Sequence, residues 1–85
     1  MKADTKQVKR LLNTARGQLE GIIKMVDEDR YCIDISNQIM ASQAVLSRAN
    51  KEIMKAHVLH CLQNSTGELS REKLEEIAVL LDKVL

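Results

Sequence analysis

The spacing of apolar residues along the chain predicts three amphipathic helices. In the first, over about residues 4 to 28, apolar side chains recur at steps of three and four, the period of a helix with one buried face. Gly17 and Gly21 lie inside this pattern and indicate either close helix contact or simple tolerance. The stripe consists of Val8, Leu11, Leu12, Ala15, Leu19, Ile22, Ile23 and Val26.

The second predicted helix covers about residues 32 to 63 and follows a short acidic connection at residues 27 to 30. Its apolar and weakly polar surface is wider than one partner helix requires. Such a surface predicts packing on several sides, as in a four-helix bundle built by two chains. The main seam consists of Cys32, Ile35, Ile39, Ser42, Leu46, Ala49, Ile53, Ala56 and His60, with Met40, Gln43, Asn50, His57 and Cys61 on adjoining faces.

The third predicted helix covers about residues 70 to 84. Ser70 is placed to cap its start, with Leu69 and Leu74 as a hydrophobic staple, and Gly67 is placed to end the preceding helix. We therefore expect an all-α fold and a single domain over residues 1–85. A chain of this length is only marginally stable alone, so oligomerisation is expected to complete its core.

Cys32, His57 and Cys61 carry the side chains that thiophilic metals prefer. His57 and Cys61 are four residues apart, so one helix presents both on the same side. No proline or glycine interrupts residues 22 to 66, which puts Cys32 roughly 37 Å from His57 along one helix. Because such a distance prevents one chain from closing the site, the spacing predicts an antiparallel dimer with two identical sites.

A thiolate, imidazole, thiolate set suits Cu(I), which accepts three ligands, whereas structural zinc usually has four. His60 is the remaining histidine, and it faces about 100° away from Cys61 on the helix. Other interpretations stay open, because Cys32 alone fits a small buried hydrophobe and His57 alone fits a surface hydrogen bond. An enzyme is not expected, because no glycine-rich or convergent polar segment offers an oxyanion hole.

The net charge of +1 conceals an asymmetry. Residues 1–24 carry +4, residues 25–61 carry −1 and residues 62–85 carry −2. A basic N-terminal end suits a polyanion such as nucleic acid, although a solvated helix surface gives the same pattern. No segment resembles a membrane span or a secretory signal, so a cytoplasmic location with reduced thiols is expected.

Several short segments together resemble the copper-sensing CsoR-type family of bacterial transcriptional repressors. They are TARGQ at 14–18, DRYC at 29–32, DISNQ at 34–38 and RAN at 48–50, followed by His57 and Cys61 in HxxxC. The resemblance covers essentially the whole chain. It implies a homodimer that pairs into tetramers, binds operator DNA when metal-free and releases it when Cu(I) binds to Cys32 of one protomer and His57 and Cys61 of the other.

The resemblance also assigns supporting residues. Tyr31 and Glu76, or its neighbour Glu75, are expected to orient His57 through its other ring nitrogen. The family has a basic residue at the position of Leu11, where this chain offers Lys9 and Arg10 just before it. The expected DNA contacts are Lys9, Arg10, Arg16, Gln18 and Arg48.

Relatives that sense other signals differ at these positions. Nickel- and formaldehyde-sensing relatives use an N-terminal histidine, which this chain lacks, and persulfide-sensing relatives lack the histidine that corresponds to His57. The copper branch fits best. The alternatives that stay open are a thiol or persulfide sensor, a zinc or nickel sensor and a structural helical adaptor.

Overall fold

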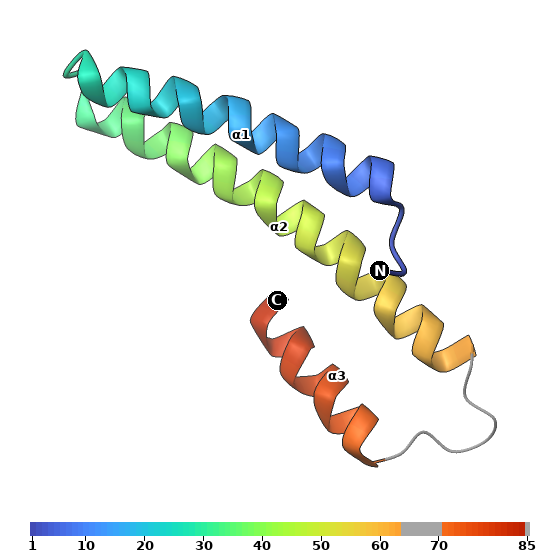
Figure 1. Cartoon of the computed structure of the whole chain (residues 1–85). Coiled ribbons are helices and arrows are strands. Elements are labelled where there is room, and N and C mark those ends of the chain that lie inside the picture. The colour runs from blue at the N-terminus through green and yellow to red at the C-terminus, as the bar shows by residue number, and fades with distance from the viewer. Residues whose placement is uncertain (64–70, 85) are drawn as a thin grey trace.

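The computed structural model describes residues 1–63 and 71–84, which form three α-helices (Figure 1). These are α1 (Thr5–Asp27), α2 (Cys32–Gln63) and α3 (Arg71–Val84), and the described residues contain no strand. The three predicted helices and the all-α class are confirmed, with ends that agree to one residue. The predicted caps at Gly67 and Ser70 and the staple residue Leu69 lie outside the described residues.

The first helix begins at a capping aspartate. The Asp4 carboxylate accepts hydrogen bonds from the backbone amides of Lys6 (3.0 Å) and Gln7 (3.5 Å), two of the donors that a helix start leaves without a partner. This cap fixes the basic end of α1, where Lys6, Lys9 and Arg10 follow within two turns.

Helices α1 and α2 form an antiparallel hairpin along most of their length (Figure 1). Its core is small and consists mainly of aliphatic side chains of α1 against short side chains of α2. The buried polar residue Ser42 donates a hydrogen bond to the amide oxygen of Gln18 (3.0 Å), which links the two helices. The buried residues are Val8, Leu11, Ala15 and Ile22 from α1 and Ser42 and Ala49 from α2.

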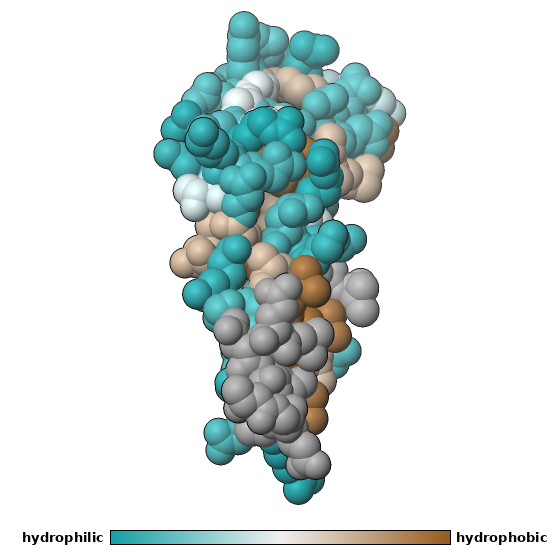
Figure 2. Space-filling model, turned by 90° about the vertical axis from the view of Figure 1, so that its right-hand side faces the viewer, coloured by the Kyte–Doolittle hydropathy of each residue, from teal (hydrophilic) through white to brown (hydrophobic). Residues whose placement is uncertain are grey.

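The chain is a thin layer of helices. Helix α3 turns back along the C-terminal part of α2, on the other side of α2 from α1, and the Cα atoms span 58 × 25 × 12 Å (Figure 1). A layer one helix thick has two open faces, and apolar surface remains exposed at its edge (Figure 2). Gly17 and Gly21 do not mark a close helix contact, because a Cβ atom at either position would meet no atom within 4 Å.

The exposed surface exceeds that of a compact monomer. The accessible area is 6668 Å², whereas a folded monomer of this mass exposes about 5,100 Å². Many large apolar side chains contribute to the excess, among them Leu19, Ile23, Ile39 and Leu46, each more than 40% exposed. None of the helices in residues 1–63 and 71–84 is long and apolar enough to span a membrane.

Candidate metal centre and basic surface

Cys32 is the first residue of α2 and follows a turn that backbone hydrogen bonds close. Asp29 has φ = 52°, in the left-handed region, and its amide donates to the carbonyl of Val26 (3.1 Å). The amide of Arg30 donates to the carbonyl of Met25 (3.0 Å). This pair of bonds is the Schellman motif that ends many helices, here with aspartate at the position that usually holds glycine.

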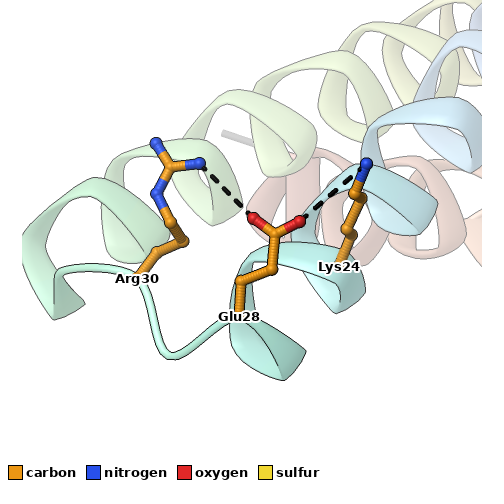
Figure 3. A network of polar contacts seen from close by, with 3 residues as sticks. All are labelled: Lys24, Glu28 and Arg30. Carbon is orange, nitrogen blue, oxygen red and sulfur yellow. Dashed lines mark ion pairs between the residues drawn. The ribbon is translucent and has the colours of Figure 1, made fainter.

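A carboxylate also links the two sides of this turn. Glu28 forms ion pairs with Lys24 (Nζ–Oε1 3.9 Å) and Arg30 (Nη1–Oε2 3.8 Å), as Figure 3 shows. The carbonyl of Tyr31 then accepts the hydrogen bond from the amide of Ile35 (3.1 Å), which starts α2 directly after the turn. The side chain of Cys32 is exposed there as a free thiol, and that of Tyr31 is 65% exposed.

His57 and Cys61 converge near the other end of α2. The Nε2 atom of His57 lies 3.8 Å from Sγ of Cys61, and both side chains are half-buried. Two ligands of one ion, with metal–sulfur and metal–nitrogen bonds of about 2.3 and 2.0 Å, lie roughly 3.5 to 3.8 Å apart. The two side chains therefore already have the separation that a shared metal ion requires.

Glu76 on α3 contacts the same histidine. Its Oε1 atom lies 3.5 Å from Nε2 of His57, whereas Glu75 pairs with Arg71 on its own helix (3.5 Å). Of the two glutamates that the sequence left open, Glu76 is the one beside the imidazole. The contact uses Nε2, the nitrogen that also faces Cys61, so Glu76 and Cys61 share one ring atom of His57. The expectation that the carboxylate orients His57 through its other ring nitrogen is therefore wrong for this structure.

The described residues of one chain do not complete a metal centre. Cys32 lies at the opposite end of α2 from His57 and Cys61, and the described residues hold no cluster of three cysteine, histidine or acidic side chains that could bind an ion. His60 is half-buried and lies next to Cys61 in the sequence. The chain thus presents a two-ligand half-site at one end of α2 and a single thiol at the other.

The expected DNA-contacting side chains differ in exposure. Lys9, Arg10, Arg16 and Arg48 are exposed, and Lys9 and Arg16 share one side of α1 because they are two turns apart. The Arg10 guanidinium donates two hydrogen bonds to the side-chain oxygen of Gln7 (3.2 and 2.9 Å). A shallow hollow of basic and polar residues opens on this part of α1, lined by Lys6, Lys9, Arg10, Asn13 and Thr14.

Two positions near this surface face inward. Leu11 is only 4% exposed and packs in the hairpin core, so it belongs to the apolar stripe and not to the basic surface. Gln18 is half-buried, and its amide oxygen accepts the hydrogen bond from Ser42. Sequence reasoning placed Ser42 in the seam of α2 but did not identify this bond, because nothing in the sequence links residues 24 positions apart.

Comparison with known proteins identifies the family. The family model described as "Metal-sensitive transcriptional repressor" matches residues 4–83. The chain is 46% identical over 73 residues to the copper-sensing transcriptional repressor CsoR of Mycobacterium ulcerans and 40% identical over 73 residues to CsoR of Mycobacterium tuberculosis H37Rv. It is 36% identical over 76 residues to CsoR of Bacillus subtilis 168.

The alignments cover a larger share of this chain than of its relatives. The alignments cover 86%, 86% and 89% of this chain, in the same order, and 61%, 60% and 73% of the relatives. The chain thus spans about three fifths of the length of the two mycobacterial proteins. No solved structure is significantly similar to it. Transcriptional repressors are regulators, which agrees with the expectation that the chain is not an enzyme. The chain belongs to the metal-sensitive transcriptional repressor family.

Proposed function

We propose that this protein is a Cu(I)-responsive transcriptional repressor that binds operator DNA when metal-free and releases it when Cu(I) binds. The observation that carries the proposal is the half-site formed by His57 and Cys61, 3.8 Å apart, with a free exposed thiol at the other end of the same helix. Relatives across most of the chain are named as copper-sensing repressors. Derepressed genes would then encode copper efflux or buffering proteins.

The complete site lies between two copies of the chain. Cys32, Ile39, Leu46 and Ile53 recur every seven residues along α2, so they share one side of the helix, and His57 and Cys61 continue that side. A second α2 that runs antiparallel along this stripe brings Cys32 of the partner subunit to the half-site. The stretch from Cys32 to His57 and Cys61 is centred near Leu46, so the two-fold axis passes close to that residue.

The apolar face supports the same assembly. One side of the helix layer gathers exposed apolar residues from both helices of the hairpin. Viewed from the start of each helix, these residues are rotated away from the buried face in the same direction, and on two antiparallel helices this rotation leads to the same side of the layer. They are Leu12, Leu19, Ile23 and Val26 of α1 and Leu46 of α2. Each chain exposes roughly 1,600 Å² more than a compact monomer. Two chains together therefore have an excess of about 3,000 Å², an area that an obligate dimer interface buries. The dimer is therefore a four-helix bundle of two hairpins, and pairing of two such dimers gives the tetramer.

The side chains fit Cu(I) chemically. Cys32 of one protomer, with His57 and Cys61 of the other, supplies two soft thiolates and one imidazole, a donor set that favours Cu(I) over ions that require four ligands. Tyr31 directly precedes Cys32, and its side chain is 65% exposed. Glu76 contacts the imidazole of His57 from α3 at Nε2, so a metal ion bound to that atom would replace this contact. When bound, the ion supplies a soft Lewis acid that joins two protomers.

The basic surface supplies the DNA interaction. Lys9, Arg10, Arg16 and Arg48 are exposed on the hairpin, whereas Gln18 is half-buried and bonded to Ser42. Arginine and lysine side chains on helix surfaces contact mainly phosphates, so affinity falls steeply with salt concentration. Metal and DNA are coupled because each favours a different arrangement of the same protomers, and DNA must weaken copper binding by the factor by which copper weakens DNA binding.

The test is a titration of DNA binding. A duplex is first selected from a random library by the reduced, metal-free protein, and binding is then followed by fluorescence anisotropy with and without one Cu(I) per chain. We expect Cu(I) to release the duplex, whereas zinc and an oxidant leave it bound. Release by the oxidant alone would instead indicate a thiol sensor, and failure to select any duplex would indicate a structural adaptor.

A matched pair of variants tests the link through α3. Glu76→Ala is expected to keep copper affinity within a few-fold and to lose most of the copper-induced release, because the contact from α3 to His57 is gone. Glu75→Ala removes the neighbouring carboxylate, which pairs with Arg71, and should behave as wild type. Normal release by Glu76→Ala would exclude this route.

A further inference from the structure

The first turn of α2, which carries Cys32, is not held by the hydrophobic core. Every residue from 26 to 34 is exposed, and Ile35 is the first side chain of α2 that is even half-buried. The start of a helix with no packed side chain frays unless a cap or a turn holds it. Tyr31, which precedes the helix, has no side-chain oxygen of the kind that caps helix starts. Within one chain the order of Cys32 therefore depends on the turn before it, and in the proposed dimer the partner subunit packs against this end of α2 as well.

Backbone conformation is what holds this turn. The ion pairs of Glu28 with Lys24 and Arg30 are 3.9 and 3.8 Å long and involve exposed side chains, a class of contact that contributes little. The hydrogen bonds of the Schellman motif form only when the residue at position 29 adopts the left-handed region, as Asp29 does with φ = 52°. Aspartate tolerates that region, and β-branched residues do not.

We infer that Asp29 is a positioning residue for the metal site: its left-handed conformation closes the turn and so places the Cys32 thiol before any metal arrives. This inference rests on the proposed role of Cys32 as a ligand. If only a fraction of molecules holds the turn closed, the apparent dissociation constant for the metal rises by the inverse of that fraction. A variant that leaves the turn closed in about one molecule in ten would bind Cu(I) about tenfold more weakly.

The experiment compares two substitutions at this one position in the full chain. Asp29→Gly removes the carboxylate but favours the left-handed region, whereas Asp29→Val removes the carboxylate and disfavours it. Cu(I) affinity is measured by competition with a chelator. Hydrogen exchange of the Arg30 and Ile35 amides is measured by NMR on the metal-free protein, because these amides close the turn and start α2.

We expect Asp29→Gly to match wild type within about twofold in both measurements and Asp29→Val to lose about tenfold in both. Asp27→Val, two residues earlier inside α1, is the matched control and should match wild type, because its backbone is helical. Wild-type affinity and exchange in Asp29→Val, or an equal loss in both substitutions of Asp29, would overturn the inference alone. If the wild type bound no Cu(I), the proposed function would fail together with it.

Discussion

Leu46→Glu is expected to separate the proposed dimer, because the proposed antiparallel arrangement puts Leu46 beside the two-fold axis. Its side chain is 43% exposed in the single chain, and in the proposed dimer the partner subunit buries the remaining part. Full burial of a leucine stabilises by about 1.5 to 3 kcal/mol, so this part contributes roughly 1 kcal/mol per chain and about 2 kcal/mol per dimer. This lost burial alone weakens association about 30-fold.

The two new carboxylates add to that loss, since they face each other across the axis. Like charges removed from water at an interface cost at least as much again, so the dissociation constant should rise on the order of a thousandfold. Sedimentation velocity over a concentration series from nanomolar to micromolar measures the change directly. Circular dichroism of the same samples checks that the helices remain.

Leu59→Glu provides the matched control. Leu59 is 47% exposed on the same helix, but 13 residues along an α-helix turn it about 140° away from Leu46. It lines an open hollow near the N-terminal segment, together with two lysines and two acidic residues, where a new carboxylate stays in water. Equal dissociation in both variants, or none in Leu46→Glu, would refute the placement of the two-fold axis.

Three further predictions concern the site, the hairpin and the basic surface. His57→Ala should abolish the copper response of DNA binding, measured by anisotropy, while any response to thiol oxidation survives. Ser42→Ala and Gln18→Ala should each lower the melting temperature by a few degrees, and a double-mutant cycle should give a coupling energy of about 1 kcal/mol. If the effects of the two substitutions simply added, the hydrogen bond would not contribute to stability. Arg48→Ala should reduce the salt dependence of DNA binding by about 0.9 per lost phosphate contact, and an unchanged slope would place Arg48 away from the DNA.

The helices could be predicted from the sequence because they depend on local periodicity. Apolar residues at steps of three and four predicted α1 and α2, and the charged run from Asp27 to Arg30 predicted the connection between them. The same periodicity placed Leu11 in the apolar stripe, and the structure buries it in the hairpin core.

The pairings between helices could not be predicted in the same way. The contact of Glu76 with His57 depends on how α3 returns along α2, and helical spacing does not specify that return. The bond between Ser42 and Gln18 depends on the register of the hairpin. By contrast, the ion pair of Lys24 with Glu28 has the spacing of four that a helix favours, so sequence reasoning could have found it.

The left-handed conformation of Asp29 gave only a weak sequence signal. A glycine at the end of a helix indicates this conformation. Here an aspartate adopts it, within an acidic run from which the sequence predicted only a short connection. The consequence for Cys32 therefore emerged from the backbone geometry and from the exposure of the residues around it.

The proposed metal site joins two protomers, and mixed dimers test this arrangement most directly. Cys32→Ala and Cys61→Ala chains are each unable to form a complete site in their own dimers. A dimer with one chain of each kind retains one complete site, made by Cys32 of the second chain with His57 and Cys61 of the first. Chelator competition on the mixture should therefore show tight Cu(I) binding at one ion per mixed dimer. Tight binding by either variant alone, or none in the mixture, would contradict a site shared between subunits.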